Sequence, residues 1–215
     1  MTPRPQLRRG LYLILTNPVA GYEILTEMAV EANLPAVQFR PKARPGQPPD
    51  DAELLRTARA LRAITRGSST LFIVNDRPDL AVECDADGVH VGQTDLAPRE
   101  ARRRVGEHRL VGLSTHNLLQ VDAAANEPID YVGFGPLYAT NSKANPDPVV
   151  GPDQLARAAG LARHPIVAIG GLTPERILAL DPASFRCAAV IRAVTEADHP
   201  LQAMRRIQHI LELRL

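Results

Sequence analysis

The chain has 215 residues, and its 25 lysines and arginines nearly balance 24 aspartates and glutamates. This balance argues against nucleic-acid or membrane partners, because no net charge attracts a polyanion over long range. Cys84 and Cys187 match neither a metal-ligand spacing nor a disulfide framework, so we expect both to pack in the core of a cytoplasmic protein. No apolar run approaches the roughly 20 residues that span a bilayer, and the amino-terminal segment is unlike a secretory signal. We therefore expect a soluble, unprocessed chain.

Short apolar, β-branched runs recur along the chain, each followed by turn residues and helical patterns. The runs begin at Leu11, Ala36, Thr70, Asp87, Arg109, Asp130, Pro165 and Cys187. Helical spacing of leucine and alanine follows in segments such as 52–65 and 201–215. This alternation predicts a single (β/α)8 TIM barrel over residues 1–215. The alternative is an open doubly wound sheet, which would need fewer strands and a Gly-rich first turn.

Two connecting segments are unusually long or irregular. Residues 43–51 are rich in proline and glycine, which predicts a mobile loop beside the second strand. Residues 139–151 follow the sixth run and are long for a connection from strand to helix. Loops of this length in a compact domain are commonly functional.

Polar residues at the carboxyl ends of the runs are the first candidates for a site, because barrel enzymes place their chemistry there. Period two puts Gln38 and Arg40 on the same face, which we expect to point into the barrel mouth. A buried arginine requires an anion, and either a substrate or a structural carboxylate would satisfy it. Lys42, taken alone, is typical of solvated surface.

Carboxylates follow the third and fourth runs, at Asp76 and Asp95. Neighbouring carboxylates can share Mg2+, which is bound through one or two carboxylates together with waters and substrate phosphates. The alternative is helix capping, because Pro78 and Pro98 stand at sensible early helix positions. Without further context, the residue types favour capping.

Hydroxyl and basic groups follow the fifth and sixth runs. Ser114 can bond a phosphate oxygen or start a helix, and His116 is more typical of a loop or a cap than of a catalyst. Thr140, Ser142 and Lys143 place two hydroxyls and an ammonium in one short segment. That composition is typical of phosphate binding.

The last two runs end near a predicted anion site. Gly170 and Gly171 end the seventh, and the eighth strand is expected to continue through residues 190–193. Barrels often hold a phosphate on backbone N–H groups of the loops after these strands. The glycines alone are weak evidence, because a tight turn needs glycine for its own geometry.

Taken in order, five segments resemble the successive motifs of the thiamine phosphate synthase family. They are QFRPK, IVNDRPDLAVECDADGVHVGQTDL, GLSTHN, DYVGFGPLYATNSK and PIVAIGG, and they cover most of residues 11–194. The resemblance implies a transferase that joins 4-amino-2-methyl-5-hydroxymethylpyrimidine diphosphate to thiazole phosphate by Mg2+-assisted dissociative displacement. It also replaces the structural interpretations of Arg40, Asp76 and Asp95 with functional ones.

The same resemblance implies a role for each candidate residue. Gln38 and Asn75 would hold the aminopyrimidine, and Asp76 and Asp95 would bind Mg2+. The pyrophosphate would be contacted by Arg40, Lys42, Ser114 and Lys143, of which Arg40, Ser114 and Lys143 would act in catalysis. The thiazole phosphate would be held by Thr140, Ser142, Gly171, Ile191 and Arg192.

The sequence departs from the family pattern at two places. Arg192 stands where the family usually has a serine that binds the thiazole phosphate, and PGQPP follows Lys42 by two residues. We expect Arg192 to replace the serine as phosphate ligand. Alternatives are a thiazole tautomerase that uses His116 for proton transfer and a non-catalytic barrel that binds a thiamine precursor. The sequence leaves open a homo-oligomer and a carboxylated thiazole substrate.

Overall fold

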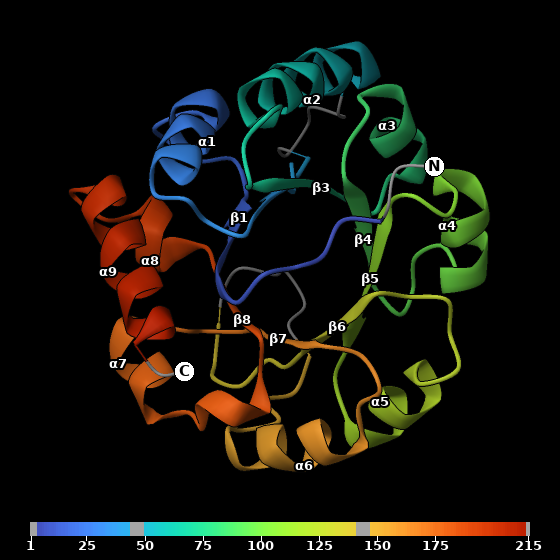
Figure 1. Cartoon of the computed structure of the whole chain (residues 1–215), viewed down its shortest axis with the longest axis vertical. Coiled ribbons are helices and arrows are strands. Elements are labelled where there is room, and N and C mark those ends of the chain that lie inside the picture. Colours follow the sequence, from blue (N-terminus) through green and yellow to red (C-terminus); the bar gives the residue numbers. More distant parts are fainter. Residues whose placement is uncertain (1–3, 44–49, 141–146, 214–215) are drawn as a thin grey trace.

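The computed structural model describes residues 4–43, 50–140 and 147–213, in which eight parallel strands close into a barrel (Figure 1). The strands pair in chain order, and β8 pairs with β1. Their bounds are β1 Gly10–Leu15, β2 Ala36–Phe39, β3 Leu71–Asn75, β4 Gly88–Val91, β5 Leu110–Thr115, β6 Tyr131–Phe134, β7 Ile166–Ala168 and β8 Cys187–Val190. Each strand coincides with one of the predicted runs. The (β/α)8 prediction is therefore confirmed, and the open sheet is wrong.

Helices surround the barrel on its outer side (Figure 1). They are α1 Tyr22–Glu31, α2 Asp51–Thr65, α3 Pro78–Glu83, α4 Pro98–Val105, α5 Leu118–Ala124, α6 Asp153–Leu161, α7 Pro174–Ala179, α8 Arg192–Thr195 and α9 Pro200–Glu212, with a 3-10 turn, η1, at Pro182–Ser184. Among the described residues, no helix combines the length and apolar character needed to cross a membrane.

Side-chain alternation along the strands separates two apolar layers. Leu11, Leu13 and Leu15 are buried in the cluster that also contains helix residues, so they pack between β1 and the helices. Tyr12 belongs to a second cluster of mostly strand residues, which fills the barrel interior. Cys84 and Cys187 are both buried free thiols, as expected. Period two thus decides which residues can reach a site inside the barrel.

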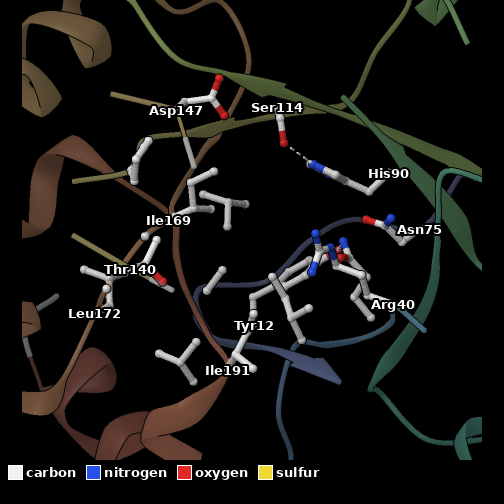
Figure 2. Close-up of a pocket in the computed structure, with 18 of the residues that line it drawn as sticks. Tyr12, Arg40, Asn75, His90, Ser114, Thr140, Asp147, Ile169, Leu172 and Ile191 are labelled. Carbon is white, nitrogen blue, oxygen red and sulfur yellow. Dashed lines mark hydrogen bonds between the residues drawn. The ribbon is translucent and has the colours of Figure 1, made fainter. Parts of the chain in front are cut away.

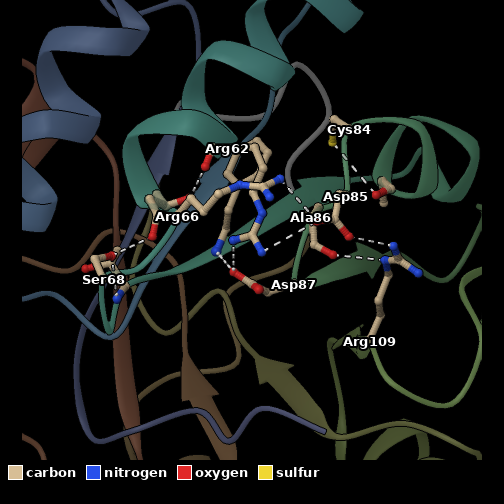
Figure 3. Close-up of polar contacts among 12 residues, drawn as sticks. Arg62, Arg66, Ser68, Cys84, Asp85, Ala86, Asp87 and Arg109 are labelled. Carbon is tan, nitrogen blue, oxygen red and sulfur yellow. Dashed lines mark hydrogen bonds and ion pairs between the residues drawn. The ribbon is translucent and has the colours of Figure 1, made fainter. Parts of the chain in front are cut away.

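The amino-terminal end of the barrel is tied by ion pairs (Figure 3). Asp87, just before β4, accepts hydrogen bonds from the Phe72 backbone N–H at 2.8 Å and from Arg62 Nη1 at 3.0 Å. Asp85 pairs with Arg109 at 3.0 Å. These groups lie at the opposite end of the strands from the polar residues singled out above, so they serve stability rather than chemistry.

The structure bears on the predicted loops and on the predicted end of the eighth strand. Most of the predicted loops, residues 44–49 and 141–146, lie outside the described residues, as do Ser142 and Lys143. The prediction that strand eight continues to residue 193 is wrong: β8 ends at Val190, Ile191 has φ −120° and ψ −85°, and Arg192 begins α8. A continuous apolar run does not by itself distinguish strand from helix, which is why the boundary was missed.

Candidate active site

A cavity of about 340 Å3 opens at the carboxyl ends of the strands. All eight strands, or the loops that follow them, contribute to its lining. Figure 2 shows Arg40 and Asn75 on one side of this cavity and Thr140 and Leu172 across from them. Among the predicted residues, the lining contains Gln38, Arg40, Asn75, Asp76, Asp95, Ser114, Thr140, Gly171, Ile191 and Arg192. The fold therefore gathers these distant positions into a single space.

A carboxylate pair faces a guanidinium at one edge of the cavity. Burial and the adjacent Asp95 carboxylate raise the pKa of Asp76 from its ordinary value of 3.8 to about 7. Burial lowers the pKa of Arg40, while Asp76 and Asp95 oppose that effect. Asp95 is held in place by the Gly92 backbone N–H, which donates to its Oδ2 at 2.8 Å. This cluster combines two adjacent carboxyl groups, of which Asp76 keeps its proton up to about pH 7, with one cation beside them.

Helix capping is not the role of these aspartates. The residue that caps α3 is Arg77 and the one that caps α4 is Ala97, and neither makes a side-chain capping hydrogen bond. Asp76 has a left-handed backbone with φ 60°, and its N–H donates to the His90 carbonyl oxygen at 2.8 Å. This turn directs the Asp76 side chain to the cavity that Asp95 also lines. The capping interpretation is therefore wrong.

Hydrogen-bonded side chains cross the floor of the cavity. Gln38 Nε2 donates to the Tyr12 hydroxyl at 3.0 Å, and the Tyr12 and Tyr131 hydroxyls are 2.9 Å apart. His90 Nδ1 lies 3.1 Å from the Tyr131 hydroxyl, and His90 Nε2 lies 2.9 Å from Ser114 Oγ, the bond drawn in Figure 2. Ser114 therefore does not start a helix. It faces the cavity, and its hydroxyl is held by the hydrogen bond to His90.

A glycine creates the space for this arrangement. His90, Gly112 and Tyr131 are register partners across β4, β5 and β6. A Cβ at Gly112 would overlap the Tyr131 ring and would lie 2.5 Å from His90 Nδ1. The rings of His90 and Tyr131 stack over this position with centroids 5.5 Å apart. Only glycine lets Tyr131 reach across β5 to the histidine.

His116 also lines the cavity, but it is not a capping residue. Its Nδ1 donates to the Gly135 carbonyl oxygen at 2.6 Å, and its Nε2 lies 3.3 Å from Asp147 Oδ2. Asn117 caps α5 instead, accepting from the Gln120 N–H at 2.9 Å. His116 is thus fixed against the segment that follows β6.

The turn after β7 requires glycine for close packing. Gly170 and Gly171 have φ 92° and 64°, conformations that residues with side chains rarely adopt. A Cβ at Gly171 would lie 2.6 Å from the Ala139 carbonyl oxygen. The backbone after β7 thus presses against the segment after β6, beside Thr140 in the cavity lining. Turn geometry accounts for both glycines, and their role toward a phosphate stays a prediction.

Two arginines that follow β7 and β8 contribute to the cavity lining. Arg192 is exposed and contributes to the lining from the start of α8. Arg176, which the sequence analysis missed, also contributes, with its guanidinium 4.6 Å from the centre of the Tyr138 ring. These two guanidinium groups supply positive charge of the kind that an anion site requires.

Lys42 is the one described residue of the predicted set that does not contribute to the cavity lining. Its backbone is clamped by Asn17, whose Oδ1 accepts from the Lys42 N–H at 3.1 Å and whose Nδ2 donates to the Lys42 carbonyl oxygen at 2.9 Å. The structure thus fixes the chain at Lys42 next to the barrel mouth. Its contact with a pyrophosphate stays a prediction.

Sequence reasoning did not single out Tyr12, His90 and Tyr131. A signal for them was present, because period two places each on the inward face of its strand, where a polar tip among apolar neighbours needs a partner. The partners come from other strands, so only the closed barrel shows that these residues form a connected set.

Comparisons with known sequences and structures relate this chain to proteins of thiamine phosphate synthesis. A family model described as thiamine monophosphate synthase matches residues 11–194. A thiamine-phosphate synthase from Anaeromyxobacter dehalogenans is 40% identical over 205 residues, covering 94% of this chain and 88% of that protein. One from Synechococcus sp. (strain CC9605) is 39% identical over 209 residues and 97% of this chain. The chain spans 57% of the length of that cyanobacterial relative.

A solved structure extends the likeness to three dimensions. The thiamine phosphate pyrophosphorylase from Pyrococcus furiosus superposes with a TM-score of 0.84 and 27% sequence identity, over 99% of this chain and 98% of that one. The family model matches most of this chain, and the relative from Anaeromyxobacter dehalogenans is covered over most of its own length. The chain belongs to the thiamine monophosphate synthase family.

Proposed function

We propose that the protein is a thiamine phosphate synthase, which condenses the pyrimidine diphosphate with thiazole phosphate to release thiamine phosphate and pyrophosphate. The observation that carries this proposal is the meeting of Arg40 with the Asp76–Asp95 pair in a cavity of a chain that belongs to this family. In the reaction, the exocyclic carbon–oxygen bond to pyrophosphate breaks and a carbon–nitrogen bond to the thiazole forms. The alternatives, a thiazole tautomerase and a non-catalytic binding barrel, find no support among the relatives.

The carboxylate pair fits a divalent cation. Burial and the adjacent Asp95 raise the pKa of Asp76 to about 7, so Asp76 keeps a proton that a cation bound between the two carboxyl groups can replace. Asp76 and Asp95 would hold Mg2+ through oxygen, the ligand atom it prefers. Bound there, Mg2+ would supply positive charge beside the departing pyrophosphate.

The residues of the chain would position and neutralise the leaving group. Arg40 lies beside the carboxylates and can form a forked, charge-assisted contact with pyrophosphate oxygens. The Ser114 hydroxyl, Lys42 and Lys143 would complete this set. Because positive charge develops on the pyrimidine as the leaving group departs, catalysis by electrostatics and positioning needs no nucleophilic side chain.

The remaining lining residues would hold the two organic rings. Gln38 and Asn75, on the Arg40 side of the cavity, would bind the aminopyrimidine. The thiazole phosphate would be held by Thr140, Ser142, Gly171, Ile191 and Arg192, of which Thr140 lies across the cavity from Arg40. With the thiazole held in this way, its nitrogen would face the pyrimidine from the side opposite the leaving group, as an in-line displacement requires.

The proposal extends to the context of the chain. Residues 1–215 would form one domain that acts in the cytoplasm on small molecules, without a nucleic-acid or membrane partner. A homo-oligomer is compatible with this activity.

One assay tests the proposed function. Purified protein is mixed with pyrimidine diphosphate, thiazole phosphate and Mg2+, and pyrophosphate release is followed over time. We expect release that requires both organic substrates and that stops when EDTA removes the metal. Release at the same rate without thiazole phosphate, or no release, would overturn the proposal.

A further inference from the structure

We propose that Tyr12, Tyr131 and His90 form a directional hydrogen-bond relay that orients the Gln38 carbonyl at one end and the Ser114 hydroxyl at the other. These three residues would act as positioning residues, since each acts through its neighbour. The inference rests on the proposed function for the identity of the substrates. It explains why the cavity offers an acceptor at Gln38 and a donor at Ser114.

The relay is continuous, and its Gln38, Tyr12 and Tyr131 side chains are buried. It runs from Gln38 on β2 through Tyr12, Tyr131 and His90 to Ser114 on β5, with each step between 2.9 and 3.1 Å. Gln38, Tyr12 and Tyr131 are no more than 2% exposed. In such surroundings an unsatisfied donor is costly, so the direction in which each proton points is constrained.

The direction follows from counting donors. Gln38 Nε2 donates, so the Tyr12 oxygen accepts there and its single proton must find another acceptor. That acceptor is the Tyr131 oxygen, 2.9 Å away. Burial raises the pKa of both phenols, so each keeps the proton that the relay needs.

With a neutral His90, the second half of the relay then has one arrangement. Because Tyr131 accepts from Tyr12, its own proton points to His90 Nδ1 at 3.1 Å. A neutral imidazole that accepts at Nδ1 carries its proton on Nε2, which donates to Ser114 Oγ at 2.9 Å. All the protons along the relay therefore point from Gln38 toward Ser114.

This direction decides what the cavity offers a ligand. Because Gln38 Nε2 is turned toward Tyr12, the carbonyl oxygen of the same amide is turned away from Tyr12, and this acceptor suits the ring amino group of the pyrimidine. Ser114 already accepts from His90, so its own proton is available to an oxygen of the pyrophosphate. A relay of the opposite direction would present an amide N–H to the amino group and a lone pair to the anion, and both contacts would be repulsive.

The direct test is the protonation state of His90 in the full, ligand-free chain. Two-bond 1H–15N correlation spectra of 15N-labelled protein at pH 8 separate the imidazole tautomers, and loss of one set of signals in His90→Asn assigns them. We expect the Nε2–H tautomer for His90 in the wild type. The Nδ1–H tautomer, or an imidazolium, would overturn the relay. This measurement needs no substrate and no folded variant other than the one used for assignment.

A second arm asks whether Tyr131 sets that tautomer. Tyr131→Phe removes the donor to Nδ1, so we expect a mixture in which the Nδ1–H form becomes detectable. The control is Tyr22→Phe, which removes a hydroxyl that bonds Asn17 outside the relay and should leave the His90 signals in place. Unchanged His90 signals in a folded Tyr131→Phe protein would contradict the proposal.

Kinetics connect the relay to specificity. Tyr12→Phe frees the Gln38 amide to rotate, so the KM for pyrimidine diphosphate should rise roughly 2- to 10-fold while kcat changes less. An unchanged KM would contradict the orientation of Gln38 by Tyr12. If the tautomer is as expected but the wild type shows no condensation, the proposed function fails and the relay stands.

Discussion

Gly112 offers a sharp test of how the barrel interior is built, through the substitution Gly112→Ala. The added methyl group would overlap the Tyr131 ring and lie 2.5 Å from His90 Nδ1. Tyr131 is only 1% exposed and is hydrogen-bonded on both sides, so a shift of its ring would disrupt these hydrogen bonds. Overpacking of this kind costs about 1–3 kcal/mol, and loss of a hydrogen bond adds about 1 kcal/mol. We expect a free energy of unfolding lower by about 2–4 kcal/mol.

The matched control is Gly160→Ala. Gly160 is an exposed residue of α6, and a Cβ there meets nothing within 4 Å. Alanine is the better helix former, so this variant should gain about 0.5 kcal/mol. Urea denaturation with linear extrapolation measures both changes. If Gly112→Ala proves as stable as the wild type or as Gly160→Ala, the packing of Tyr131 across β5 is refuted.

Three further predictions follow from single side chains. In EDTA, Asp76→Asn should be as stable as the wild type at pH 4 and more stable by about 1–2 kcal/mol at pH 8. The reason is that the folded wild type loses the stabilising proton on Asp76 as the pH rises through the Asp76 pKa of about 7. Equal stability of the two proteins at pH 8 would refute this prediction. Asp87→Ala should lower the free energy of unfolding by about 2–4 kcal/mol in urea titrations, since Arg62 and the Phe72 N–H lose a shared acceptor; a loss below about 0.5 kcal/mol would contradict it. Arg192→Ala should reduce kcat/KM for thiazole phosphate roughly 10- to 150-fold in steady-state assays, with little change in the KM for pyrimidine diphosphate. Unimpaired use of thiazole phosphate would show that Arg192 does not bind the thiazole phosphate.

Much of the fold was predictable because its signals are local. The β-branched runs and their period of two predict the strands, and the same period places Gln38 and Arg40 on the inward face, where both contribute to the cavity lining. The end of β8 was not predictable, because the apolar run continues without a turn residue into α8 and the break occurs in the backbone of Ile191.

The site was predictable in part. From residue types alone, Asp76 and Asp95 favoured capping, and only the resemblance to a family gave them a role; the barrel then brings them together from β3 and β4. The relay through Tyr131 depends on contacts between strands that are far apart in sequence. No local pattern contains such contacts, since they exist only after the barrel closes.

The central claim is that this cavity joins two organic substrates, and the identity of the product tests it most directly. Wild-type protein is incubated with pyrimidine diphosphate, thiazole phosphate and Mg2+, and thiamine phosphate is quantified by mass spectrometry alongside pyrophosphate. We expect one thiamine phosphate for each pyrophosphate released and, in a parallel reaction with Arg40→Ala, both falling together by at least about 100-fold. Pyrophosphate without thiamine phosphate, or full synthesis by Arg40→Ala, would contradict the account.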